Sequence, residues 1–423
     1  MSTPVVEVRA WGKRVGALAP DPRLEAYVFE YDPAWARTGI ELAPLTMPVT
    51  RAERRFVFPE LAPSFLRLPG LVADALPDDF GNALINAWMA HRGIAAAEVT
   101  ALDRLSYMGK RAMGALEFRP AGGSHTESRK PLDMQSLVEA ARIALHGDFS
   151  GDSHAQAALA NIIRVGTSAG GARAKAVIAW NPATEEIRSG QFDVAPGFEH
   201  WLVKFDGVGA DLELGTSKDY GRIEYAYYKM ATSAGIEMMS SRLLHENGRS
   251  HFMTKRFDRS GNAKHHVQSL CALAHLDYKQ RATNSYEQLF LAIQRLGLDD
   301  HAHRQAYLRM VFNVMARNCD DHTKNFAFVL RQHEPWALAP AFDVTHAHNP
   351  KGQWTAQHLM SVNGRFDDIR RADLEVVDRF GVVDARGAVA AVRTALERWP
   401  EFAAEAGVSP AEQQRVAADF RPL

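Results

Sequence analysis

MARNCDDHTKNFAFVL, residues 315–330, crowds asparagine, aspartate, histidine and lysine between two apolar runs. The run before it, with Leu308, Val311 and Phe312, has helical spacing, and FAFVL after it has the composition of a strand. Polar side chains at such a junction are held at fixed geometry by the core elements on either side. The sequence therefore predicts a functional loop between a buried helix and a strand.

The spacing inside this loop points to phosphoryl transfer. Asp320 and Asn325 form D-x-x-x-x-N, the interval found in the catalytic loop of protein kinases. The aspartate of such a loop orients the attacking hydroxyl, and the amide oxygen of the asparagine binds magnesium. Asp343, in PAFD after a predicted hairpin, supplies a second hard oxygen ligand. We therefore expect a kinase-type site.

Three features upstream would complete such a site. Lys204 ends the apolar strand WLVK, and Glu224 follows on a predicted helix, where the two can form the ion pair that positions the lysine. The segment VGTSAGGARAK, residues 165–175, offers glycines whose backbone N–H groups suit phosphate oxygens. It is not a Walker A loop, because Ala172 stands where the lysine must be. The order of all these features along the chain favours the functional interpretation.

The bulk composition excludes some classes of protein. The chain has 423 residues, 46% of them hydrophobic, and 49 Lys plus Arg nearly balance 50 Asp plus Glu, so no global field marks a nucleic-acid or membrane-surface binder. No segment approaches the roughly 18 apolar residues of a spanning helix, and the start lacks a signal-peptide pattern. We expect a cytoplasmic protein without a membrane partner. Cys271 and Cys319 are too few for a disulfide framework or a Cys-rich zinc site.

Hydrophobic periodicity predicts an α+β fold. The predicted strands cover 14–19, 25–31, 40–49, 174–180, 200–205 and 251–257. The predicted helices cover 78–92, 131–146 and 222–235. Beyond residue 258 the pattern is mainly helical, with a capping box at residues 285–288.

These motifs resemble those of the HipA-type serine/threonine kinase toxins of bacterial type II toxin–antitoxin systems. SAGGARAK is similar to that family's S-x-x-G-x-x-x-K loop, KRFDR to its E-R-F-D-R strand, and DDHTKN to its D-x-H-x-K-N catalytic loop. RVGALAP, FEYDPAW and DALPDDFGNALI resemble its N-terminal module. The resemblance implies a protein-kinase-like bilobal fold. Its parts would be an α+β module over 1–122, a small mixed-sheet N-lobe with phosphate loop and hinge over 131–258, and a mainly helical C-lobe over 259–423.

The resemblance also implies roles for single residues. Asp320 matches the catalytic aspartate, and Asn325 and Asp343 match the magnesium ligands. Ser168 matches the serine that family members autophosphorylate, with Thr167 beside it as a second hydroxyl. The positions implied to bind ATP are Gly170, Gly171, Ala172, Arg173, Ala174, Lys175, Lys204, Glu224, Lys255, Arg256, Phe257, His322, Thr323, Lys324, Asn325, Phe342 and Asp343.

The implied reaction moves the γ-phosphate of ATP, with Mg²⁺, to a protein hydroxyl. The implied target is an aminoacyl-tRNA synthetase such as glutamyl-tRNA synthetase, and the outcome is arrest of translation and growth. A phosphate on Ser168 would place about two negative charges beside the ATP phosphates, which implies self-inactivation. The implied partners are a helix-turn-helix, HipB-like antitoxin and, through that complex, operator DNA.

The sequence departs from the family pattern at two places. Lys255 replaces a glutamate, which matters little if only its backbone contacts adenine. HHVQSLCAL, residues 265–273, stands where the best-known members have a Gln-Glu-Asp segment. Asp321 has no assigned chemistry, and we expect it to be solvated or to cap the turn.

Two alternatives remain open. One is a catalytically weak HipA-like protein that acts with the antitoxin in operator repression. The other is a metal hydrolase that uses the side chains of Asp320, His322, His346 and His348. It is the weaker one, because His346 and His348, two apart, would point to opposite faces of a strand.

Overall fold

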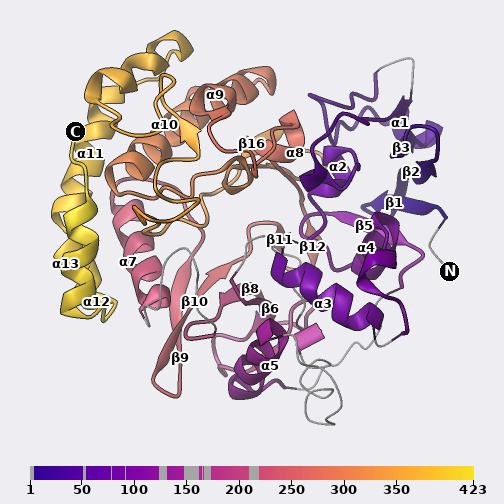
Figure 1. The fold of residues 1–423 in the computed structure, drawn as a ribbon, viewed down its shortest axis with the longest axis horizontal. Helices are drawn as coiled ribbons and strands as arrows, with labels where there is room; N and C mark the ends of the chain where they lie inside the picture. Colours follow the sequence, from indigo (N-terminus) through magenta and orange to yellow (C-terminus); the bar gives the residue numbers. More distant parts are fainter. Residues whose placement is uncertain are drawn as a thin grey trace. The chain divides into compact units, whose positions relative to one another are not determined.

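The computed structural model of the chain (Figure 1) describes residues 4–50, 54–77, 79–90, 92–122, 131–146, 162–163, 165, 173–208 and 219–423. The chain forms two compact units. The first comprises Met1–Gly209, Lys255–Gln268 and Val329–Pro335, and the second comprises Ala210–Thr254, Ser269–Phe328 and Trp336–Leu423. Among the described residues, no helix is long and apolar enough to span a membrane.

An antiparallel sheet of the first unit has the strand order β4-β3-β2-β1-β5. Its strands are β1 Val6–Ala10, β2 Lys13–Asp21, β3 Ala26–Tyr31, β4 Arg55–Phe56 and β5 Leu116–Arg119. Alternate residues of β1 are buried, as expected for a strand with one face on a core. The strands predicted at 14–19 and 25–31 are confirmed as β2 and β3.

The strand predicted at 40–49 is wrong. This segment consists of turns and bends, and Pro44 and Pro48 within it have no N–H to donate to a ladder. The Glu41 carboxylate accepts a hydrogen bond from the backbone N–H of Val49, at 2.9 Å to Oε2, so the two ends of the segment are held together. The apolar composition of residues 40–49 is therefore not sufficient to predict a strand.

The first unit also contains helices. They are α1 Pro33–Ala36, α2 Gly70–Ala73, α3 Asp79–Ala90, α4 Ala101–Met108 and α5 Met134–His146, with short 3-10 turns η1 Pro63–Phe65 and η2 Ala96–Glu98. Thr100 and Asp103 form a capping box that starts α4, and α4 ends at Gly109, whose φ of 53° suits glycine. The helices predicted at 78–92 and 131–146 are confirmed as α3 and α5.

Three further strands of the first unit pair antiparallel in the order β7-β6-β8. They are β6 Lys175–Trp180, β7 Ile187–Ser189 and β8 Glu199–Lys204. All six residues of β6 are buried, so both faces of this strand are covered. The hairpin of β11 Arg259–Ser260 and β12 Ala263–Lys264 also belongs to this unit.

The second unit is mainly helical. Its helices are α7 Tyr220–Ser233, α8 Leu270–Ala274, α9 Tyr286–Arg295, α10 Asp300–Met315, α11 Ala385–Glu397, α12 Trp399–Glu405 and α13 Pro410–Asp419, with 3-10 segments η3 Thr323–Asn325 and η4 Arg371–Phe380. Helix α10 packs against α9 and α11 (Figure 1) and buries side chains all round. It is the core helix of this unit.

The remaining strands are short. They are β9 Ser241–Glu246, β10 Arg249–Lys255, β13 His266–Ser269, β14 Asn284–Ser285, β15 Ala327–Leu330, β16 Trp336–Leu338 and β17 Met360–Ser361. The predicted helix at 222–235 and strand at 251–257 are confirmed as α7 and β10, and the capping box at Ser285 starts α9.

Candidate active site

The polar loop predicted from the sequence follows α10 directly. The Asp299 side chain caps the start of this helix by accepting a hydrogen bond from the N–H of Ala302 at 3.0 Å. At its end, the backbone N–H of Cys319 donates to the carbonyl of Ala347 at 2.9 Å, and the N–H of Ala347 donates to the carbonyl of Arg317 at 3.2 Å. These bonds fix the chain just before Asp320.

A hydrogen bond joins the two ends of the loop, Asp320 and Asn325. Nδ2 of Asn325 donates to the backbone carbonyl of Asp320 at 2.7 Å. The bond uses the amide N–H and leaves Oδ1 of Asn325, the atom that magnesium prefers, for another partner. The Asp320 side chain is 48% exposed, so its carboxylate can reach a hydroxyl brought from solution.

Asp343 lines the same small cavity as Asn325. The cavity has a volume of about 10 Å³, and Asp321 and Phe342 also line it. That volume is about enough for one ion or water molecule. The neutral oxygen of Asn325 and the carboxylate of Asp343 are hard ligands, so the donor set fits Mg²⁺. The structure therefore brings Asn325 and Asp343 to one cavity, and their role as magnesium ligands stays a prediction.

His322 and Lys324, between Asp320 and Asn325, lie against Tyr278. Nε2 of His322 is 3.7 Å from Oδ1 of Asp320, and the imidazole meets the Tyr278 ring edge-on at 5.3 Å between centroids. Nζ of Lys324 lies 4.7 Å from the centroid of the same ring. The Thr323 hydroxyl donates to the carbonyl of Leu276 at 3.0 Å. Tyr278, missed by the sequence analysis, is therefore the side chain that orders this part of the loop.

Asp321 corrects a prediction. It was expected to be solvated or to cap a turn, but it is fully buried. Its Oδ2 accepts hydrogen bonds from the Tyr286 hydroxyl at 2.7 Å and from Nδ1 of His358 at 2.9 Å, and its Oδ1 accepts one from the N–H of Leu359 at 2.8 Å. Asn313, on α10, donates to the Tyr286 oxygen at 3.0 Å. Asp321 thus anchors the loop in the core, while the Asp320 side chain is exposed to solvent.

The charge of this network follows from the position of His358. Burial disfavours its imidazolium form, but the Asp321 carboxylate and Cys319 favour that form, and the pKa of His358 is raised to about 10. His358 is therefore a cation at neutral pH and forms a buried ion pair with Asp321. Nothing in the sequence around His358 indicated this role.

Two lysines lie side by side in the first unit. Lys175 on β6 and Lys204 on β8 are directly opposite in the antiparallel register, so their side chains share one face of the sheet, and both are buried. Two neighbouring basic residues on one face favour an anion there. Ala174 precedes them and accepts a hydrogen bond from the N–H of Phe205 at 2.9 Å, and Arg173 is half-buried.

Several predicted positions stay predictions. Glu224 is buried on α7, in the second unit, so its ion pair with Lys204 is untested. The predicted phosphate-loop residues Gly170, Gly171 and Ala172, and the hydroxyl residues Thr167 and Ser168, lie outside the described residues. The predicted domain boundaries are likewise untested.

The strand predicted to receive adenine has its side chains engaged elsewhere. Nζ of Lys255 bonds to Oε1 of Glu199 at 2.7 Å, and the Arg256 guanidinium bonds to the carboxylate of Asp258. The backbone N–H of Arg256 donates to the carbonyl of His200 on β8 at 3.0 Å. Lys255 is thus half of a partly exposed ion pair with Glu199.

The prediction that His346 and His348 point to opposite faces of a strand is wrong. No strand forms at these residues, and both imidazoles reach Asp419 on α13, at 2.9 Å for Nε2 of His346 and 3.2 Å for Nδ1 of His348. Within the described part of the chain, no three or more His, Cys, Asp or Glu side chains are placed to hold a metal ion. The metal-hydrolase alternative therefore has no ligand set there.

Two protein families match this chain. The family described as HipA-like C-terminal domain matches residues 167–420, and the family described as HipA N-terminal domain matches residues 6–119. No curated protein matches the chain significantly.

Two solved structures show how far the likeness extends. One is HipA of Shewanella oneidensis MR-1, solved in a complex with HipB and operator DNA. It has a TM-score of 0.68 and 16% identity, over 98% of this chain and 94% of that one. The proinflammatory kinase CtkA of Helicobacter pylori gives a TM-score of 0.34 and 12% identity, over 52% of this chain and 88% of that one. The likeness to HipA confirms the predicted fold class, and because the C-terminal family alone covers more than half of the residues, the chain belongs to the HipA family.

Proposed function

We propose that this protein is an ATP-dependent kinase of the toxin type, which phosphorylates a serine or threonine hydroxyl of a protein. The observation that carries the proposal is the catalytic loop. An exposed Asp320 is joined through its carbonyl to Asn325, and Asn325 and Asp343 line one cavity with room for a single ion. This combination supplies a base and two oxygen ligands on a buried scaffold.

The residues divide the reaction between them. Asp320 orients the attacking hydroxyl and accepts its proton while the oxygen bonds to the γ-phosphorus and the bond to the ADP oxygen breaks. Lys175 and Lys204 bind the phosphates of ATP by their positive charge. Asn325 and Asp343 would hold Mg²⁺, which would neutralise negative charge on those phosphates.

Family membership supports a proposal for the partners and the target. The Shewanella HipA was solved with HipB and operator DNA, and we propose a HipB-like helix-turn-helix antitoxin for this chain, with operator DNA bound through the complex. We propose an aminoacyl-tRNA synthetase, such as glutamyl-tRNA synthetase, as the target, and self-inactivation by phosphorylation of Ser168. A catalytically weak protein that acts only through the antitoxin is the competing function.

Labelling with γ-labelled ATP and Mg²⁺ tests the proposal. The wild-type chain should label itself or an added aminoacyl-tRNA synthetase, and Asp320→Asn should lose this labelling by about a hundredfold or more, as expected for a catalytic base. Asp300→Asn, which removes an exposed carboxylate at the start of α10, is the matched control and should label normally. Undiminished labelling by Asp320→Asn would overturn the assignment. Antitoxin binding without any labelling by the wild type would favour the competing function.

A further inference from the structure

A second cavity lies in the first unit, lined by none of the residues predicted to bind the nucleotide. It has a volume of about 630 Å³. The N-terminal module contributes Trp11, Lys110 and Glu117, the segment 188–198 forms one side, and His200 and the β11–β12 hairpin complete it. Cavities that bind small molecules typically measure about 300–1,000 Å³. The space is therefore large enough for a metabolite.

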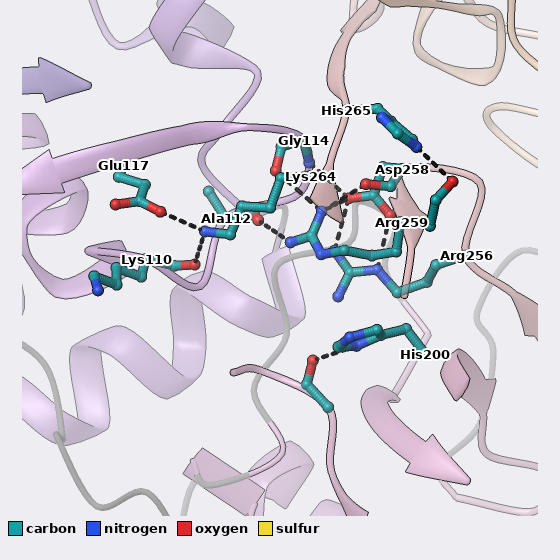
Figure 2. Close-up of polar contacts among 12 residues, drawn as sticks. Lys110, Ala112, Gly114, Glu117, His200, Arg256, Asp258, Arg259, Lys264 and His265 are labelled. Atoms are coloured by element: carbon teal, nitrogen blue, oxygen red, sulfur yellow. Dashed lines mark hydrogen bonds and ion pairs between the residues drawn. The ribbon is translucent and has the colours of Figure 1, made fainter. Parts of the chain in front are cut away.

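A buried charge cluster of Arg256, Asp258 and Arg259 (Figure 2) meets this cavity at Arg259. The Asp258 carboxylate is fully buried and accepts hydrogen bonds from Nε and Nη2 of Arg256, at 2.8 and 2.7 Å, from Nη1 of Arg259 at 2.6 Å, and from the N–H of Gly114 at 2.7 Å. One carboxylate thus serves two guanidinium groups. Arg256 and Arg259 are also buried. The two guanidinium groups carry two positive charges and Asp258 carries one negative charge, so these three residues together have a net positive charge.

The residues that line the cavity are basic on balance. Four carry positive charge, Lys110, Arg188, Arg259 and Lys264, and two carry negative charge, Glu117 and Asp193. Lys264 is matched by Glu117, with Nζ 2.9 Å from Oε1 (Figure 2), and Arg188 by Glu186 at 2.7 Å. Arg259 lines the cavity, pairs with Asp258, lies within electrostatic range of Asp193, and donates from Nη1 to the carbonyl of Gly114 at 3.1 Å. Burial, followed by the neighbouring Arg256, lowers the pKa of Arg259 to about 10, so it stays charged near neutral pH.

His200 adds a neutral polar group to the lining. It is 5% exposed, and its Nδ1 lies 3.1 Å from the carbonyl of Gly190 (Figure 2). Burial, followed by Arg256 and Arg259, lowers the pKa of His200 to about 4, so the imidazole is neutral and Nδ1 is the nitrogen that donates. The Asn262 side chain, which also lines the cavity, makes a polar contact with this imidazole, and Nε2 carries a lone pair. It can accept a hydrogen bond from a hydroxyl group.

The walls of the cavity are held in place by hydrogen bonds. The backbone N–H of Val194 donates to Oδ1 of Asn262 at 2.8 Å, and Nδ2 of Asn262 donates to the carbonyl of Val194 at 3.1 Å. Nε1 of Trp11 donates to the carbonyl of Lys264 at 2.8 Å. The hairpin is therefore fastened to both the N-terminal module and the segment 188–198. A cavity fixed in this way loses little conformational entropy when a ligand binds.

We propose that this cavity binds a small phosphate monoester, with the phosphate at Arg259, Arg188 and Lys110 and a hydroxyl group at His200. A phosphate monoester carries about 1.5 to 2 negative charges at neutral pH, against one for a carboxylate. The lining itself has two more basic than acidic residues, but Glu186 and Asp258 beside it pair with Arg188 and Arg259, so the shape of the guanidinium groups favours the phosphate more than the net charge does. Guanidinium groups also match phosphate oxygens in geometry as well as charge.

Calorimetric titration of the full chain with glycerol 3-phosphate, at constant ionic strength, tests the proposal. The wild type should bind glycerol 3-phosphate. It should bind glycerol, which lacks the charge, and succinate, which lacks the phosphate, more weakly. The variant Lys110→Gln/Arg188→Gln should bind about tenfold more weakly or worse, since it removes two charges from the lining. Lys110 is exposed, so Lys110→Gln alone is a second variant that leaves the fold intact.

Two controls separate this cavity from other sites. Arg23→Gln/Arg37→Gln removes two exposed arginines outside the cavity and should bind the probe like the wild type. Lys204→Ala alters the predicted nucleotide site and should also bind it unchanged. The proposal is overturned if the wild type does not bind glycerol 3-phosphate, if succinate binds as well or better, or if only Lys204→Ala loses binding.

Discussion

Nδ1 of His358 lies 2.9 Å from Oδ2 of Asp321, and both side chains are almost completely buried. The pair stands one residue from Asp320, whose carboxylate is half-exposed. Adjacent aspartates in one loop thus have opposite environments. The buried one fixes the backbone of the loop, which holds the exposed one in position.

Replacement of each aspartate by asparagine should separate the two roles. Asp321→Asn leaves the His358 imidazolium without its counter-charge, and breaking a buried ion pair on one side costs about 3–5 kcal/mol of stability. Asp320→Asn removes an exposed charge and should change stability by about 0.5 kcal/mol or less. Urea unfolding of both variants measures this difference. Equal stability of the two would contradict the structural role of Asp321.

The same pair makes stability fall at alkaline pH. The pKa of His358 is about 10 in the folded protein, against about 6.5 in the unfolded chain. Because the folded pKa is the higher one, the stabilisation is fully present below about pH 6.5 and is lost as the pH rises towards about 10. The free energy of unfolding, measured from neutral to alkaline pH, should decline in the wild type and decline less in His358→Gln. Parallel curves would show that another group causes the loss.

Local sequence patterns were sufficient for much of the fold and for part of the site. Residues 25–31 alternate in the manner of a strand, and residues 222–235 carry a helical stripe, so both elements were predicted. The interval from Asp320 to Asn325 is local too, and one hydrogen bond within the loop joins them. Such features depend only on neighbours in the chain.

The missed features depend on residues far apart in the sequence. Asp321 and His358 are separated by 37 positions, and no local pattern shows that a loop aspartate will meet a histidine from that distance. His346 and His348 were misjudged for the same reason, because Asp419 on α13 gathers both imidazoles. Residues 40–49 differ, because here the deciding feature is local. The apolar composition favours a strand, but Pro44 and Pro48 prevent one.

Lys204 and Lys255 should differ in their effect on nucleotide binding. Lys255→Met breaks a partly exposed ion pair with Glu199, which is worth about 1 kcal/mol at most, and leaves the backbone predicted to contact adenine. Lys204→Met removes a buried basic residue predicted to bind phosphates, so ATP affinity should fall by about tenfold or more. Titration of each variant with ATP and Mg²⁺ measures both effects. Equal losses would argue that the Lys255 side chain itself binds the nucleotide.

Asp343 should control the magnesium requirement of nucleotide binding. Its φ is 53°, a left-handed conformation that asparagine also adopts readily, so Asp343→Asn keeps the backbone and one oxygen while removing the charge. Mg²⁺ prefers charged oxygen ligands, and we expect the Mg²⁺ concentration for half-maximal ATP binding to rise by about tenfold or more. Asp300→Asn, outside the cavity that Asp343 lines, serves as the control of equal charge change and should leave that concentration unchanged. An Asp343→Asn variant with the magnesium dependence of the wild type would remove Asp343 from the proposed metal site, and would leave Asp321, already paired with His358, as a carboxylate that lines that cavity.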